Sequence, residues 1–101
     1  MRAVGLIEVF GLTAALVAAD AACKAANVKI EALDNNKPKN ADELEVPVLI
    51  VVKFSGTVSD VNMAMEAAIN ASNKISGVHS KYIMSHPDEG IKKFIKISCI
   101  K

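Results

Sequence analysis

The sequence has few aromatic side chains, little cysteine and no tryptophan. Only 4% of its 101 residues are aromatic, although 51% are hydrophobic. The apolar content is therefore carried mainly by Ala, Val, Ile and Leu, which pack closely but bury little area each. A chain of this length has room for one small domain with a modest core, which we expect to span residues 1–101. The remaining apolar surface favours association with further copies.

Neither charge nor cysteine is concentrated in a functional pattern. Twelve Lys and Arg residues are matched by eleven Asp and Glu, and because no basic run stands out we expect no nucleic-acid partner. Cys23 and Cys99 have no CxxC or Cys/His spacing, which argues against a metal site or disulfides and fits a reducing cytosol. No apolar run reaches about 18 residues, and Met1–Val9 lacks the core of an export signal. We expect a soluble cytoplasmic protein without a membrane partner.

No pattern indicates catalysis. His79 and His86 lie seven residues apart without a partnered Cys or carboxylate, and no Ser/His/Asp or Cys/His set is present in a motif. We expect no catalytic residue, no metal and no cofactor. Met65 is expected in the core, and Cys23 is expected to act as a small hydrophobe on the buried face of its helix.

The first half of the chain predicts a strand, a helix and two more strands. Ala3–Val9 is a short apolar run ended by Gly11, and Val28–Leu33 alternates at period two. Val46–Val52 is nearly continuous and suits a central strand that starts near Pro47. The helix between the first two strands is expected to bury one face, composed of Leu12, Ala15, Leu16, Ala19, Ala22, Cys23 and Ala26.

The second half predicts a helix, a strand and a tail. Thr57 and Asp60 have capping-box spacing, and Gly77 is placed to end the helix. Val78–Met84 follows as a strand and Ile91–Ile100 as a short helix or extended tail. The order β-α-β-β-α-β predicts an α/β (α+β) fold with an antiparallel, ferredoxin-like sheet and both helices on one face. The expected buried helix face is Val58, Val61, Met65, Ala68, Ile69, Ser72 and Ile75.

One ordered run of residues resembles a known family. Gly5-Leu6-Ile7-Glu8, Gly11-Leu12-Thr13-Ala14-Ala15, Ala18-Ala19-Asp20-Ala21 and Lys24-Ala25-Ala26-Asn27-Val28 are similar to the opening of the bacterial microcompartment (BMC) shell domain. That domain occurs in carboxysome and propanediol-utilisation hexamers. The resemblance implies a structural, cyclic homohexamer with a pore on its sixfold axis, which packs edge to edge into sheets with other shell proteins. Targeting peptides of encapsulated enzymes are candidate partners. It also implies a location in the shell of a cytoplasmic microcompartment.

Three residues match or replace the family's hexamer-edge positions. The resemblance places Lys24, near Asn27, at this edge, and His86 stands where many members have an arginine. Histidine reaches less far than arginine and ordinarily titrates near about pH 6.5, so the contact is expected to be weaker or sensitive to pH. The alternatives are a solvated Lys24 paired with Asp20 and a turn histidine without a role in assembly.

The resemblance places the connection between the second and third strands at the pore. Residues 34–45 contain no glycine and exceed the usual hairpin length. Acidic side chains outnumber basic ones there by two, so an ordered ring is expected to favour cations. If the Lys37-Pro38-Lys39 tip faces the axis, anions are favoured instead, and a mobile, solvated loop would select nothing. The candidate pore residues are Asp34, Asn35, Asn36, Lys37, Lys39, Asn40, Asp42, Glu43 and Glu45.

A second class of function remains open from the sequence. The same order of elements suits a small regulatory or ligand-binding module that acts as an oligomer. Quaternary structure separates the two, because a shell protein forms hexamers and sheets whereas a sensor forms dimers or trimers stabilised by a metabolite.

The tail, residues 88–101, is basic through Lys92, Lys93, Lys96 and Lys101. It is expected either to bind acidic surfaces or to be solvated.

Overall fold

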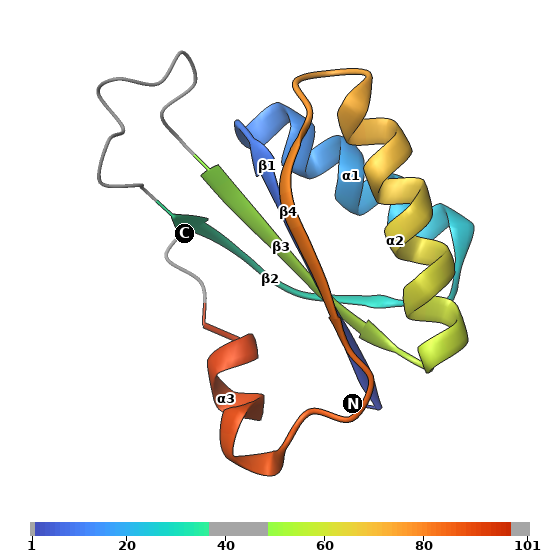
Figure 1. The fold of residues 1–101 in the computed structure, drawn as a ribbon, viewed down its shortest axis with the longest axis vertical. Coiled ribbons are helices and arrows are strands. Elements are labelled where there is room, and N and C mark those ends of the chain that lie inside the picture. Colours follow the sequence, from blue (N-terminus) through green and yellow to red (C-terminus); the bar gives the residue numbers. More distant parts are fainter. Residues whose placement is uncertain (1, 37–48, 98–101) are drawn as a thin grey trace.

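The computed structural model describes residues 2–36 and 49–97, and its elements form a four-stranded antiparallel sheet with two long helices on one face (Figure 1). The strand order β2-β3-β1-β4 confirms the expected ferredoxin-like α/β arrangement. Within the described residues, no helix is long and apolar enough to cross a membrane. In chain order the elements are β1 (Ala3–Phe10), α1 (Leu12–Ala25), β2 (Lys29–Asn36), β3 (Leu49–Gly56), α2 (Val58–Asn73), β4 (Val78–Met84), η2 (Glu89–Ile91) and α3 (Lys92–Ile95).

The side chains of the central strand β1 alternate between the two faces of the sheet. Ala3, Ile7 and Val9 join the core beneath the helices, and the alternation of a strand turns Val4 and Leu6 to the opposite face, called here the second face. The same alternation places Lys53 of β3 on the second face, between the core residues Val52 and Phe54. The short C-terminal elements η2 and α3 follow β4 on the second-face side of the sheet (Figure 1).

Small side chains let the helices approach the sheet and each other. The buried residues of α1 are all alanines, and α2 adds Ala64 and Ala68 to larger buried side chains. Alanine loses no side-chain entropy on burial and keeps backbones close. The alanine content therefore reflects a thin core whose bulk comes from the strands, chiefly Ile7, Val52 and Phe54.

The predicted start of α2 is confirmed, whereas the helix ends at Asn73, four residues before the predicted Gly77. The Thr57 hydroxyl accepts a hydrogen bond from the Asp60 N–H (3.0 Å) and donates one to the Asp60 carboxylate (2.9 Å). The first of these satisfies an N–H that has no partner within the helix. At the other end Gly77, at φ 100°, donates its N–H to the Ser72 carbonyl (2.9 Å). Only glycine adopts such a φ at little cost, so Gly77 closes the turn into β4.

Two predicted strand boundaries were wrong. β2 continues through Asp34–Asn36, which had been assigned to a loop, because these residues pair with Val51, Ile50 and Leu49 of β3. β3 runs on to Gly56 instead of ending at Val52, although it is central as predicted. Residues 37–48, including the expected strand start at Pro47, and residues 98–101, including Cys99, lie outside the described residues.

The predicted buried faces of the helices were partly wrong. Leu12, Leu16 and Cys23 of α1 are exposed, and alanines, including Ala14 and Ala18, replace them in the core. In α2, Val58 is exposed and Ala64 is buried, while Met65 is in the core as expected; Ile75, which lies beyond the end of α2, is exposed. The prediction assumed that the larger hydrophobic side chains are buried. In the structure, the close approach of α1 to α2 and the sheet leaves room only for alanine.

Candidate functional site

The antiparallel register sorts the candidate residues to two opposite ends of the sheet. At one end Ala3 pairs with Gly56, Val4 with Met84 and Lys29 with Ser55. Asn27 lies just before β2 and His86 just after β4, so both belong to this end. Asp34–Asn36 lie at the other end, where Asn36 pairs with Leu49. The structure thus separates the predicted edge residues from the predicted pore residues along the strands.

Lys24 lies in the last turn of α1, where a cation interacts favourably with the helix dipole. Its ammonium contacts the Asp20 carboxylate at 2.7 Å, and the lysine side chain remains 76% exposed. The hydrogen bond to Asp20, followed by the attraction of its charge, raises the pKa of Lys24. Within one protomer Lys24 therefore forms the predicted surface ion pair, and most of its side chain is free to contact another molecule.

Asn27 and His86 are both exposed. The Asn27 carbonyl lies close to Gly56, where an added Cβ would approach it to 3.1 Å. His86 and Pro87 line a hollow of about 380 Å³ together with Arg2, Thr57 and Lys92. At the expected edge, Asn27 therefore lies beside Gly56, and His86 lies beside the basic residues Arg2 and Lys92.

The candidate pore residues divide into two groups. Asp34 is not a loop residue, because it lies in β2 and its carboxylate Oδ2 is 3.5 Å from the ammonium of Lys53. Asn35 also lies in β2, and its N–H bonds to the Asp34 carboxylate (2.9 Å). Asn36 is the last residue of β2. The other candidates, namely Lys37, Lys39, Asn40, Asp42, Glu43 and Glu45, lie outside the described residues.

An apolar ridge on α1 was not predicted as a surface. Leu12 and Leu16 are 47% and 53% exposed. Cys23 continues this line two turns after Leu16, and its Sγ lies 4.0 Å from the Val28 carbonyl, just before β2. The ridge, defined as Leu12, Leu16 and Cys23, therefore lies on the β2 side of the molecule. The signal was present in the sequence as an apolar stripe, but it was assigned to the core.

A groove lies on the opposite side, between α2 and the edge strand β4. It encloses about 400 Å³, and its walls include Met65, Ile69, Ile83 and Tyr82, with Glu66 and Lys81 also lining it. Tyr82, the only tyrosine of the chain, is 66% exposed. Since β2 and β4 are the two edges of the sheet, the ridge and the groove face in opposite lateral directions. No pattern in the sequence indicates this groove, because it is formed by side chains of two separate elements.

Within the ranges 2–36 and 49–97, no group of three or more His, Cys, Asp or Glu side chains is placed to hold a metal ion. His79 instead contacts Phe10 edge to face, with ring centroids 5.7 Å apart. The described surface thus carries the ridge, the groove and the end of the sheet with Lys24, Asn27 and His86, and each of these suits contacts between protein molecules.

Comparisons with known proteins agree on one family. The model of the BMC domain matches residues 3–87. The chain is 33% identical over 93 residues to the carboxysome shell protein CcmK3 of Synechocystis sp., covering 89% of this chain and 82% of the relative. It is 29% identical over 94 residues to the bacterial microcompartment shell protein PduA of Citrobacter freundii, covering 93% and 91%.

A solved structure shares the fold. A microcompartments protein from Desulfitobacterium hafniense superposes with a TM-score of 0.70 at 22% identity, over 92% of this chain. This chain spans only 48% of that protein's length, so the likeness describes the domain and not the whole of that protein. The match of the family model over residues 3–87, together with these relatives, shows that the chain belongs to the BMC domain family.

Proposed function

We propose that this chain is a structural shell protein of a bacterial microcompartment in the cytoplasm. In this proposal it has no enzymatic activity, residues 1–101 act as one shell domain, and it forms cyclic homohexamers that tile with other shell proteins. The match over residues 3–87 to a family whose named relatives are shell proteins carries the proposal.

The positions of the ridge and the groove support a ring. A ridge at the β2 edge and a groove at the β4 edge are different surfaces of one protomer. Copies joined ridge to groove associate head to tail, and such an interface closes into a ring when the rotation per copy fits. Burial of Leu12, Leu16 and Tyr82 in each interface would remove from water apolar area that one protomer leaves exposed.

The two ends of the sheet can be assigned to the inside and the outside of the proposed ring. We assign the end with Asn36 and Leu49, and the connection between them, to the pore. Lys24, Asn27 and His86, at the opposite end, form the outer edge in this assignment. Asp34 faces Lys53, so the charge of the pore depends on residues 37–45. Those residues contain three acidic and two basic side chains, a smaller excess than the loop from Asp34 would have.

Electron microscopy of Lys24→Ala tests the edge assignment. The unchanged chain is expected to form sheets of hexamers in negative stain, and Lys24→Ala is expected to form discrete hexamers. Because Lys24 is exposed at the end of a helix, its replacement should leave the fold intact.

Lys74→Ala is the matched control, since Lys74 is also an exposed lysine at a helix C-terminus. It is expected to leave the sheets intact. Sheets of Lys24→Ala equal to those of the control would reject the edge role. A non-hexameric unchanged chain, measured by native mass spectrometry, would reject the shell proposal. A dimer or trimer stabilised by a metabolite would favour a ligand-binding module instead.

A further inference from the structure

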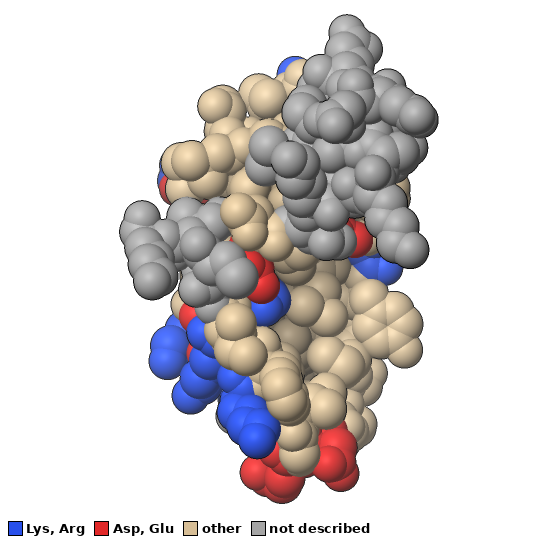
Figure 2. Space-filling view, turned by 90° about the vertical axis from the view of Figure 1, so that its left-hand side faces the viewer, with Lys and Arg blue, Asp and Glu red and all other residues tan. Residues whose placement is uncertain are grey.

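The C-terminal segment, residues 89–97, has one apolar anchor on the second face of the sheet. Ile95 is 4% exposed, whereas Ile91, Phe94 and Ile97 remain open to solvent. Val4 of β1 is fully buried on the same face, outside the core beneath the long helices. Figure 2 shows this side of the molecule, with basic side chains gathered low on one side and acidic ones at the lowest tip. A single buried isoleucine is little area to hold a segment in place.

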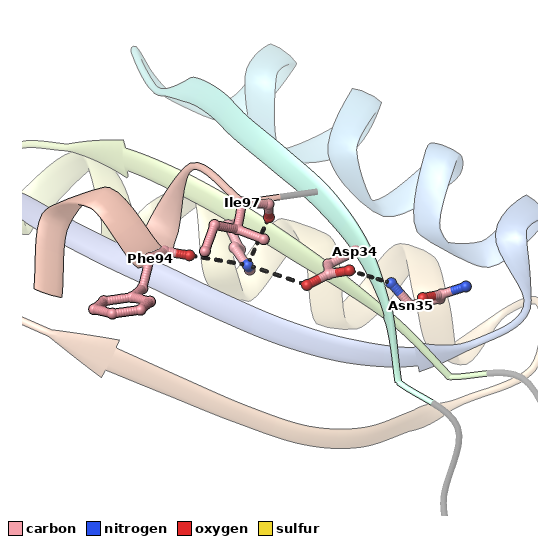
Figure 3. A network of polar contacts seen from close by, with 5 residues as sticks. Asp34, Asn35, Phe94 and Ile97 are labelled. Atoms are coloured by element: carbon pink, nitrogen blue, oxygen red, sulfur yellow. Dashed lines mark hydrogen bonds and ion pairs between the residues drawn. The ribbon is translucent and has the colours of Figure 1, made fainter. Parts of the chain in front are cut away.

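Lys53 supplies the second anchor. It is 8% exposed, and its ammonium donates to the carbonyls of Ile97 (2.9 Å) and Phe94 (3.4 Å). The Asp34 carboxylate, at 3.5 Å, is the third acceptor. A lysine ammonium has three N–H donors, so the three oxygens around it account for its hydrogen-bonding capacity (Figure 3).

The contact between Lys53 and the segment supplies hydrogen-bond partners to both. The Phe94 carbonyl also accepts from the N–H groups of Lys96 and Ile97, and the Lys53 ammonium adds a charge-assisted hydrogen bond to it and another to the Ile97 carbonyl. A buried ammonium is costly unless it is paired and hydrogen-bonded. Without the segment, Lys53 would keep Asp34 and lose both carbonyl oxygens, for which water would have to substitute. The contact therefore stabilises the docked position from both sides.

The segment is also bonded within itself. The N–H groups of Ile91 and Ile97 bond to the carbonyls of Asp88 (3.1 Å) and Phe94 (3.3 Å). Lys92 pairs with Glu89 at 2.7 Å, and the Asp88 side chain accepts from the Gly90 N–H at 2.8 Å. Each of these contacts joins residues within the range 88–97, and none of them involves the sheet. Elements with strong internal bonds and few anchors open as units.

We propose that Lys53 is the positioning residue that fastens the C-terminal segment to the second face, and that this segment is a cover released as a unit when the contact is lost. Through Asp34 the same ammonium links the segment to β2, the strand that leads to residue 37. Docking of the segment and pairing of the end of β2 with β3 are thereby coupled.

Hydrogen exchange of Lys53→Met tests the proposal. Methionine keeps the apolar stem of lysine and removes all three donors. Amides 91–97 are expected to exchange about 10- to 100-fold faster, as for the loss of hydrogen bonds to a charged group. Trypsin is expected to cut sooner after Lys93 and Lys96. Amides of α1 and α2 should keep their protection, which shows that the variant is folded.

Lys29→Met is the matched control, because Lys29 is an exposed lysine of the sheet, at the start of β2. It is expected to leave amides 91–97 unchanged. Asp34→Asn is expected to accelerate exchange less than Lys53→Met, since it leaves both carbonyl contacts in place. Equal exchange of amides 91–97 in Lys53→Met and the unchanged chain would overturn the proposal.

If Lys53→Met loses protection in α1 and α2, Lys53→Gln replaces it. Its shorter side chain has two donors and cannot serve three oxygens, so amides 91–97 should again exchange faster than in the control. Unchanged exchange in this folded variant would also overturn the proposal. Hydrogen exchange of the segment does not depend on ring formation, so this experiment tests the role of Lys53 separately from the shell function.

Discussion

At the scale of single residues, Gly5 decides how closely Phe54 can approach β1. The two residues are register partners in adjacent strands, and the Phe54 ring is fully buried. A Cβ on Gly5 would lie 2.6 Å from both Cε2 and Cζ of that ring. Real Cβ atoms do not come so close, so the largest fully buried side chain packs directly on a glycine backbone.

We therefore expect Gly5→Ala to destabilise the fold by about 1–3 kcal/mol, the usual cost of overpacking. The smaller side chain in Gly5→Ala/Phe54→Leu should remove the clash, so the double variant should lose less stability than the two single variants predict together. Urea unfolding of all four chains measures this coupling. Simple additivity would show that the Phe54 ring does not obstruct position 5.

A second residue-scale prediction concerns Glu89. The hydrogen bond from Lys92, and then the attraction of its charge, lowers the pKa of the Glu89 carboxyl. Because the folded value is below the ordinary one, the stabilisation from this carboxylate is complete above the ordinary value. It is lost as the pH falls through the lowered value. Lys92→Met should return the pKa of Glu89 to its ordinary value in an NMR titration, whereas Lys93→Met should not change it.

At the scale of elements, α2 depends on its first residues. Thr57→Ala removes the acceptor for the Asp60 N–H and should cost about 1 kcal/mol, seen as a lower Tm. Ser59→Ala is the control, because Ser59 is exposed within the first turn and does not occupy the cap position. A Tm equal to that of the control would mean that the cap does not stabilise the helix.

The elements themselves could be predicted from the sequence because their signals are local. The Thr57 cap, the positive φ of Gly77 and the alternation of the strands each act within a few residues. The end of β2 could not be predicted, since Asp34-Asn35-Asn36 has the composition of a turn and is extended only because β3 pairs with it. Local preference was overridden by a partner strand.

The functional surfaces were less predictable for a similar reason. Leu12 and Leu16 fit a helix face that faces the core, and no local signal separates a core stripe from a stripe that meets another copy. The acceptors of Lys53 include backbone carbonyls more than 40 residues away, which no spacing reveals. The family resemblance supplied Lys24, Asn27 and His86, and their role at an edge stays a prediction.

At the scale of the whole molecule, the ridge and the groove on opposite edges predict which variants prevent the proposed ring from forming. Leu16→Lys places a charge on the ridge, and Tyr82→Lys places one at the groove. Each variant alone should be monomeric in native mass spectrometry, because every interface in a head-to-tail ring needs both surfaces. A mixture of the two should give heterodimers and nothing larger, since the pair retains one intact ridge and one intact groove.

Met63→Lys is the control for these variants. Met63 is half exposed on α2 and does not line the groove. It should leave the hexamer intact. Homodimers of either single variant would show that the interface joins like surfaces, which contradicts a head-to-tail ring.

The opposed ends of the sheet have a consequence for variation within a shell. β3 alone spans about 23 Å from Leu49 to Gly56, at about 3.3 Å per residue. Changes at sites this far apart combine almost independently. In the proposed lattice, residues 37–48 could therefore be exchanged without altering the border that meets a neighbour, and chains with unlike openings could share one mosaic lattice. The permeability of such a wall would then follow the ratio in which its tiles are expressed.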